Sequence, residues 1–466
     1  MNKKEALTLI HTLKQNYKPY HPISNPDLPI YVHYIKDAMD KEESLRDGKR
    51  LFYFEFYTAP QLHYLDEALA NNTDYEHGAF SFTAILPADD KRINFIEEVF
   101  SQKYVKCSLK KDVPILPKSE LFLPGIVEFS YYIKQEYYSE SELPYFSDAY
   151  LCIDSLEPLK NDVLLSRIDE IFANINSGIS VSDIPEINST NSDNDAIKCG
   201  ITVKIYRLGG ANAAYATYPN KKSLLIDCGC DRYIPNKYIN TMIDINKNVR
   251  PSGIIISHWH IDHYALFTNI NYSNLEFIVV PSMQGMPDNI NIKIYELQQK
   301  KSVKLYALDL GPVPKNWLSS YGFCNTSMYI GNGVLPDPNA GFGDLGYRDS
   351  CNESAIIMRI GTSYKSLILP SDVSYFNWPK NINPELQFTR NHRLVVPHHG
   401  QKVYVDNTPK HTIEGATLYV SSAFKSIKNY IPYPSHSIYL DQILKYNYSY
   451  TYNYSENFKK YKSVYL

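Results

Sequence analysis

Four short apolar runs beyond residue 220 each lead into aspartate or histidine. LLI precedes Asp227, GIIIS precedes HWHIDH at 258–263, SLILPS precedes Asp372, and RLVVP precedes HHG at 398–400. Short apolar runs interleaved with helical patterns are typical of buried strands in an α/β layered domain. Such folds bind ligands at the carboxyl ends of their strands. The pattern therefore puts every polar cluster where ligands are expected.

One segment, DIPEINSTNSDNDAIK at 183–198, is polar and lacks hydrophobic periodicity, which predicts a linker. It separates an N-terminal α+β domain at 1–182 from a C-terminal α/β domain at 199–466. In the first domain, RLFYFEFYTA alternates like a strand and NDVLLSRIDEIFANINSG has helical spacing. Its histidines are scattered singly and form no catalytic group. We expect this domain to bind a protein partner, or to serve in targeting or regulation.

Charge, apolar run length and cysteine spacing limit the classes of protein to which the chain could belong. The net charge of −3 gives no overall basic field for nucleic acid. Residues 387–466 hold 10 Lys and Arg against 4 Asp and Glu, a charge of +6 that weakly indicates an anionic substrate, although a solvated basic tail explains it equally well. No run approaches the roughly 18 apolar residues of a membrane span. The polar N-terminus and seven irregularly spaced cysteines predict a cytoplasmic protein with reduced thiols.

The stretch HWHIDH places three histidines and one aspartate within six positions, in a chain with 13 histidines. Imidazole and carboxylate are common ligands of Zn, Mn and Fe. His258 and His260 alternate, so both can face one ion, while Asp262 and His263 can face a second. A polar loop that holds three histidines by chance is the plain alternative. Four ligand-type residues directly after a buried strand argue against it.

Two metal ions need further ligands, and three later stretches offer them. Asp372 ends an apolar run, where a carboxylate could bridge two ions about 3.5–4 Å apart, although alone it would be an ordinary loop aspartate. His398 and His399 are neighbours, and neighbouring side chains in extended backbone point to opposite sides. One of them should therefore bind metal and the other should face the substrate. His436 is a further candidate ligand.

In order and context these residues resemble the metallo-β-lactamase superfamily. Its marks are a strand ending in Asp-x-Gly, then His-x-His-x-Asp-His, then an aspartate that ends a later strand, then a late histidine. Here they read LLIDCG, HWHIDH, LPSD and the histidines near the end, over roughly residues 200–455. The resemblance implies an αββα sandwich for the C-terminal domain.

Within that superfamily, the late half is similar to the hydrolase domain of ComEC-type competence proteins and to phosphorylcholine esterases. The likeness is carried by CNESAIIMRIG, VVPHHGQ and VSSAFKSIKNYIPYPSHSIYLDQIL. ComEC-type proteins usually have aspartate at the position of His260 and serine at that of Gln401. The separate metal histidine of many members is also missing, since no histidine lies between His263 and His392.

The resemblance implies two divalent metal ions, zinc or alternatively manganese, and a set of ligands: His258, His260 and His399 at a first site, Asp262, His263 and His436 at a second, and Asp372 between them. It also implies catalytic roles for Asp262 and for His398, which would face the substrate. Asp227 would orient the histidine loop from behind.

The expected activity is metal-assisted hydrolysis, but the residues alone do not choose the bond. The ComEC-type likeness favours a phosphodiester in a nucleic acid, a nucleotide or a related phosphoester. One alternative is a carboxyl-type ester, such as a lactone, thioester or β-lactam. Another is a metal-stabilised binding or regulatory module without catalysis.

Overall fold

The computed structural model describes part of the 466 residues: 30–37, 49–58, 80–87, 89–94, 96, 106–110, 122–129, 145–153, 163–184, 200–208, 211–230, 238–283, 285–308, 317–333, 350–362, 365–374, 377–379, 393–395, 397–400, 417–420, 448–450 and 461–466. The chain divides into two compact units. One comprises Met1–Ile179, Pro287–Gln299 and Leu345–Tyr347, and the other Ser180–Met286, Lys300–Asp344 and Arg348–Leu466. Most of the predicted linker lies outside the described residues, so its boundaries stay a prediction.

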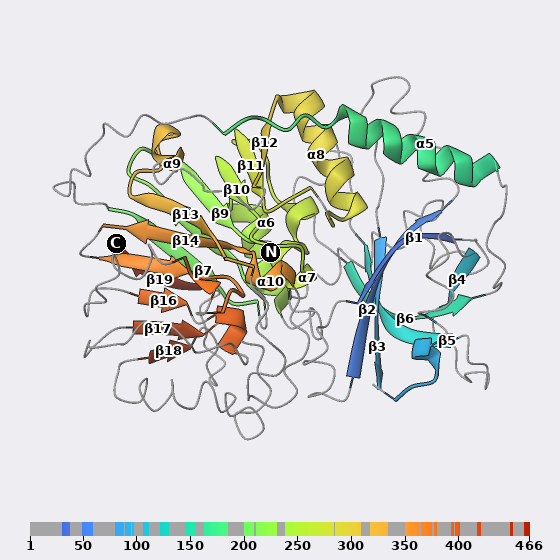
Figure 1. The fold of residues 1–466 in the computed structure, drawn as a ribbon. Helices are drawn as coiled ribbons and strands as arrows, with labels where there is room; N and C mark the ends of the chain where they lie inside the picture. Colours follow the sequence, from blue (N-terminus) through green and yellow to red (C-terminus); the bar gives the residue numbers. More distant parts are fainter. Residues whose placement is uncertain are drawn as a thin grey trace. The chain divides into compact units, whose positions relative to one another are not determined.

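The first unit contains a closed antiparallel barrel with strand order β1-β2-β3-β5-β6-β4 (Figure 1). Its strands are β1 (Ile30–Asp37), β2 (Lys49–Thr58), β3 (Phe80–Pro87), β4 (Lys106–Lys110), β5 (Phe122–Phe129) and β6 (Tyr145–Ile153). Alternate side chains of a strand face one side of the sheet, and Phe52 and Phe54 of β2 are both buried. The aromatic alternation correctly predicted β2. Closure into a barrel was not predicted.

The predicted helix of this unit is also present. It is α5 (Val163–Gly178), whose buried Ile171, Phe172 and Ile175 lie at helical spacing. Most of α8 (Asp288–Lys301) belongs to the same unit. No pattern in the sequence had indicated α8.

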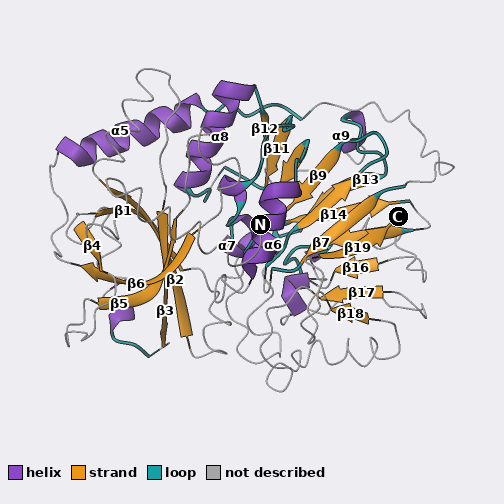
Figure 2. Ribbon diagram, turned by 180° about the vertical axis from the view of Figure 1, so that it is seen from behind, coloured by secondary structure: helices purple, strands orange, loops and turns teal. Residues whose placement is uncertain are grey.

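The second unit holds two mixed sheets (Figure 2). The seven-stranded sheet has the order β12-β11-β10-β9-β8-β7-β19, with β7 (Thr202–Tyr206), β8 (Ala214–Thr217), β9 (Ser223–Ile226), β10 (Gly253–Ile255), β11 (Phe277–Val280), β12 (Lys304–Ala307) and β19 (Tyr461–Tyr465). The six-stranded sheet runs from β13 to β18 in chain order, with β13 (Thr326–Ile330), β14 (Ile356–Gly361), β15 (Ser366–Leu369), β16 (Arg393–Val395), β17 (Thr417–Val420) and β18 (Tyr448–Tyr450). The short helices of this unit include α6 (Ile239–Asn248), α7 (Ile261–Tyr264), α9 (Trp317–Ser320) and α10 (Ser350–Glu353).

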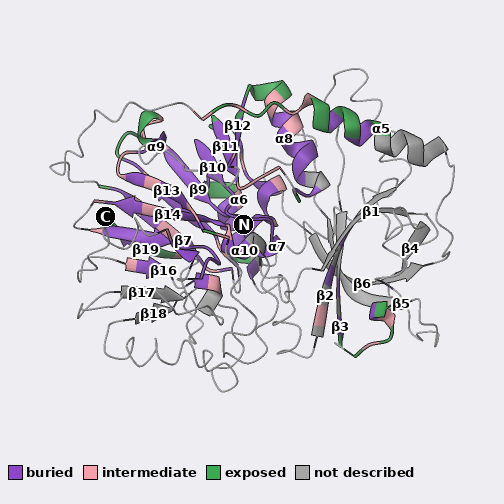
Figure 3. Ribbon diagram, in the orientation of Figure 1, coloured by how far each residue is buried: buried purple, intermediate pink, exposed green. Residues whose placement is uncertain are grey.

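Side chains from both sheets share one hydrophobic core, which stacks the sheets face to face. Ile226 and Ile255 enter it from the first sheet, and Met358 and Leu369 from the second. The opposite face of the first sheet is also buried, as Leu225 illustrates, and Figure 3 shows the strands β9 to β11 buried almost throughout. Two stacked mixed sheets with helices confirm the predicted α/β fold class.

Strand direction brings the polar clusters together. Strands β9 and β10 are parallel, as are β15 and β16. The carboxyl ends of each pair therefore lie at one edge of their sheet. The backbone N–H of Ile356, where β14 begins, donates to the carbonyl of Ser257 at 3.0 Å and ties the two sheets together beside that edge.

Two further expectations concern membranes and thiols. Among the described residues, no helix is both long and apolar enough to cross a membrane. Cys228 and Cys230 are buried, Cys324 is half-buried, and these three form no disulfide.

Candidate metal centre

The histidine motif follows β10 and turns directly into α7. His260 has extended backbone, with φ −105° and ψ 143°, and the helix begins at Ile261. Because side chains alternate in extended backbone, His258 and His260 lie on the same side. His258 Nε2 lies 3.1 Å from His260 Nδ1, and both rings are buried.

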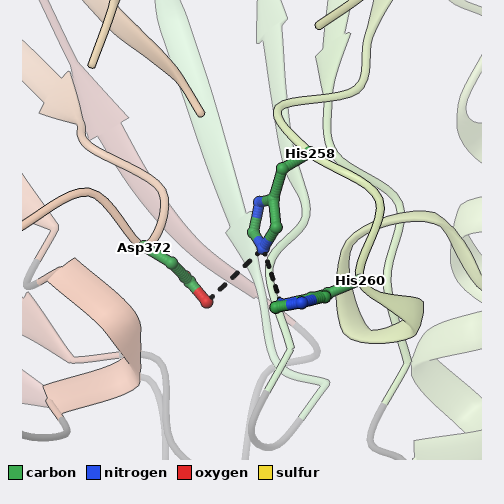
Figure 4. Close-up of side chains that lie close together, drawn as sticks. All are labelled: His258, His260 and Asp372. Atoms are coloured by element: carbon green, nitrogen blue, oxygen red, sulfur yellow. Dashed lines mark hydrogen bonds and ion pairs between the residues drawn. The ribbon is translucent and has the colours of Figure 1, made fainter. Parts of the chain in front are cut away.

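Asp372 meets these histidines from the other sheet (Figure 4). Its Oδ2 atom lies 3.7 Å from His258 Nε2, and its Oδ1 atom lies 3.3 Å from His263 Nε2. One ligand atom from each of His258, His260 and Asp372 lies within 4.8 Å of the other two. The two oxygens of one buried carboxylate thus face different imidazoles.

The spacing of these donor atoms fits a divalent metal ion. Zinc–nitrogen distances of about 2.0–2.1 Å and a tetrahedral angle give donor atoms about 3.3 Å apart. The separations from His258 Nε2, 3.1 Å to His260 and 3.7 Å to Asp372, lie on either side of that value. Two nitrogens and one oxygen are also donors that Zn, Mn and Fe share.

Asp227 supports the motif from behind. It follows β9, and its Oδ2 atom lies 2.8 Å from His263 Nδ1. Its Oδ1 atom accepts the backbone N–H of Ser257 at 2.7 Å. Because Nδ1 donates its proton to Asp227, Nε2 is the ring atom of His263 that faces Asp372.

Steric crowding explains why a glycine, Gly229, ends the Asp-Cys-Gly stretch. A Cβ atom at Gly229 would lie 1.5 Å from the carbonyl oxygen of Asp262. Next to it, Cys228 N donates to the carbonyl of His263 at 2.8 Å. Only a residue without a side chain allows the loop after β9 to pack this closely on α7. Asp227 is held beside His263 as a result.

Burial and neighbouring charges shift the pKa values of His258 and His263 in opposite directions. Burial, together with His263 and His260, holds the pKa of His258 well below its usual range. Burial also acts to lower the pKa of His263, but the carboxylates of Asp372 and Asp227 outweigh it and raise that pKa well above the ordinary value. A metal ion at His263 would therefore replace a proton on Nε2.

The remaining predicted residues lie as follows. Asp262 is buried on α7 beside His263, but its carboxylate is outside the group of three ligand atoms. His398 Nε2 lies 3.8 Å from Asp372 Oδ2, and its side chain is 13% exposed. The side chain of His399 and all of His436 lie outside the described residues.

Three of the six described non-glycine residues with positive φ lie in or beside the candidate centre. Asp227 (φ 53°), Ser371 (φ 54°) and His398 (φ 48°) all have positive φ, and each lies just after a strand. L-residues other than Asn and Asp rarely adopt this conformation. Positive φ outside glycine clusters at functional sites, where the surroundings hold it in place.

Three residues of the site were missed by sequence reasoning. The hydroxyls of Ser257 and Ser371 lie 2.7 Å apart and link the two sheets. Buried Glu353 of α10 accepts hydrogen bonds on Oε2 from Ser374 Oγ at 2.5 Å and Asn377 Nδ2 at 2.6 Å, which holds the loop that carries Asp372. Ser257 and Ser371 each directly precede a predicted ligand, and this adjacency was the available signal.

No family model matches the sequence, and no curated protein matches it. Solved structures that resemble the chain include CmlA, a diiron beta-hydroxylase from Streptomyces venezuelae, with 11% identity, a TM-score of 0.30, and coverage of 73% of this chain and 69% of that one. A mutant of the CmlA beta-hydroxylase matches with the same values. A long form RNase Z from yeast has 9% identity, a TM-score of 0.29, and coverage of 68% and 50%. Similarity at this level carries no argument about the activity of this chain.

Proposed function

We propose that the second unit is a metal-dependent hydrolase with a dinuclear centre. The carboxylate of Asp372 carries this proposal, because its Oδ2 faces His258 while its Oδ1 faces His263. A carboxylate placed in this way suits a bridge between two ions. Zinc is the expected metal, with manganese as the alternative.

The first metal site would use His258, His260 and Asp372 Oδ2, which already lie at ligand spacing. The second would use His263 and Asp372 Oδ1, with Asp262 from the same turn of α7. His399 and His436 are proposed as the further ligands of the first and second sites, on the resemblance alone.

When bound, divalent ions would supply Lewis acidity and would lower the pKa of a bound water molecule toward neutral pH. The side chains of the protein would hold the ligand atoms in place. Asp227 holds the proton on His263 Nδ1, and Asp372 keeps the two halves of the site in register. His398 is partly exposed, so its Nε2 could hold a proton for the leaving oxygen of a substrate.

His398 has a second candidate role. Its Nε2 lies 3.8 Å from the same carboxylate oxygen that faces His258, which would also suit a third imidazole at the first site. Bound metal in His398→Ala and His399→Ala separates the roles. Loss of one equivalent identifies a ligand, whereas lost turnover with two bound metals identifies the substrate-facing residue.

The proposed substrate is a phosphodiester in a nucleic acid, a nucleotide or a related phosphoester. Support comes from the likeness of the late motifs to ComEC-type domains and from the +6 charge of residues 387–466. The role of the first unit in binding a protein partner, in targeting or in regulation is a separate proposal. Deleting residues 1–197 without any change in partner binding or activity would contradict it.

The test combines metal content with turnover of bis-p-nitrophenyl phosphate, with added Zn or Mn. Asp372→Asn should lose bound metal and turnover together. Asp244→Asn is the matched control, because Asp244 is a buried aspartate of the same unit outside the cluster. Two bound metals without phosphodiester turnover, but with thioester or lactone turnover, would move the proposal to carboxyl-type esters. Wild-type protein that binds no metal would overturn it.

A further inference from the structure

Ser371 adopts a backbone conformation that costs a serine stability. Its φ is 54°, in the left-handed region that glycine adopts freely, yet a serine precedes the bridging aspartate. A strained residue persists only where the surrounding structure holds it in place, and Ser371, unlike the exposed Ser302 with φ 53°, is buried. The contacts that hold Ser371 are those of its hydroxyl, which lies 2.7 Å from Ser257 Oγ and 3.2 Å from His258 Nδ1.

That hydroxyl belongs to a chain of directed hydrogen bonds, the serine bridge, formed by Ser257 and Ser371. Ser371 Oγ donates to Ser257 Oγ at 2.7 Å, and Ser257 Oγ donates to Asp227 Oδ2 at 2.9 Å. Each serine has one hydroxyl proton, and both protons are committed in these bonds. The lone pairs of both oxygens remain as acceptors.

His258 Nδ1 faces those acceptors. It lies 3.1 Å from Ser257 Oγ and 3.2 Å from Ser371 Oγ. Because neither hydroxyl has a proton left to offer, Nδ1 must be the donor and carry the hydrogen. The lone pair of His258 is then on Nε2, which faces His260 and Asp372.

We infer that Ser371 is a positioning residue, which acts with Ser257 to hold His258 in the tautomer that presents Nε2 to a metal ion. This inference rests on the proposed metal centre and deepens it. The bridge also joins residues 114 positions apart on different sheets, so it sets the approach of Asp372 to His258. Asp227 thus orients two imidazoles: that of His263 by a direct hydrogen bond, and that of His258 through the serine bridge.

The hydroxyl does not act by filling space in the core. A cavity between the two sheets reaches Ser371, and its lining includes Asn212, Ile226, Asp227 and Leu369. Ser371→Gly removes only two heavy atoms, Cβ and Oγ, beside an existing cavity, so it changes packing little. The effect of the change should therefore arise from the lost hydrogen bonds.

The test uses Ser371→Gly in the full-length chain, because glycine relieves the strain while it removes the hydroxyl. Ser302→Gly is the matched control, since Ser302 is an exposed serine of the same unit with φ 53°. The readouts are the melting temperature of the metal-free protein, zinc affinity by competition with a chromophoric chelator, and the tautomer of His258 from ¹⁵N NMR of the metal-free protein.

Ser371→Gly should melt no lower than wild type, bind zinc at one site about 10–100-fold more weakly, and lose the Nδ1–H signature of His258. Ser257→Ala should also lose this signature, and Ser302→Gly should keep wild-type affinity and tautomer. An unchanged tautomer and zinc affinity in Ser371→Gly would overturn the inference while leaving the metal centre intact. Wild-type protein that binds no zinc, yet shows His258 protonated on Nδ1, would refute the proposed function and leave the serine bridge standing.

Discussion

Asp227→Asn removes one charge from behind the centre with almost no change in side-chain shape. Asp227 accepts three hydrogen bonds: from Ser257 N at 2.7 Å, from Ser257 Oγ at 2.9 Å and from His263 Nδ1 at 2.8 Å. Asparagine has one acceptor oxygen and an amide group that only donates. At least one of the three donors would therefore face an N–H group.

The orientation of the new amide sets the magnitude. If the amide oxygen takes the place of Oδ2, the bond from Ser257 N is lost, and the bonds from Ser257 Oγ and His263 Nδ1 are made to an uncharged acceptor. If the oxygen takes the place of Oδ1, the bonds from Ser257 Oγ and His263 Nδ1 are both lost. Since a hydrogen bond to a charged group contributes about 1.5–3 kcal/mol, we expect the free energy of unfolding of the metal-free protein to fall by about 2–5 kcal/mol. Metal affinity should fall about 10–100-fold, as for other partners of metal-bound imidazoles.

Urea unfolding followed by tryptophan fluorescence measures this loss in the relevant part of the chain. All three tryptophans, Trp259, Trp317 and Trp378, belong to the second unit. Asp244→Asn again serves as the control for loss of a buried carboxylate elsewhere in that unit. If Asp227→Asn unfolds within about 0.5 kcal/mol of wild type and keeps its metal affinity, Asp227 does not hold the motif in the way described.

Three other perturbations have defined outcomes. Gly229→Ala would place a Cβ atom 1.5 Å from the Asp262 carbonyl oxygen, so we expect insoluble or metal-free protein; soluble protein with wild-type metal content would contradict the close contact. Glu353→Ala leaves the buried donors of Ser374 and Asn377 without their carboxylate, which should cost about 1–3 kcal/mol per donor in urea unfolding, while Glu353→Gln should cost less. Burial, together with Asp227, raises the pKa of the Cys228 thiol well above its ordinary value. At pH 8, iodoacetamide should therefore label the half-buried Cys324 faster than Cys228, as measured by peptide mass mapping. Equal labelling rates would refute this expectation.

Several elements of the fold followed from the sequence alone. Alternation predicted β2, helical spacing predicted α5, and the apolar runs predicted β9, β10, β15 and β16. These elements depend on which residues are apolar and at what period, and that information is local. The placement of Asp227, the HWHIDH motif, Asp372 and His398 after the carboxyl ends of strands followed in the same way.

The architecture of the centre was decided by tertiary structure. The contact between Ser257 and Ser371, the opposed oxygens of Asp372, and the support of Glu353 all join residues that are distant in sequence. None of them has a periodic signal, because a hydrogen bond between sheets depends on how the sheets stack. Residue types and strand ends identified which side chains could bind metal. Only the packing of the two sheets decided which atoms of these side chains face one another.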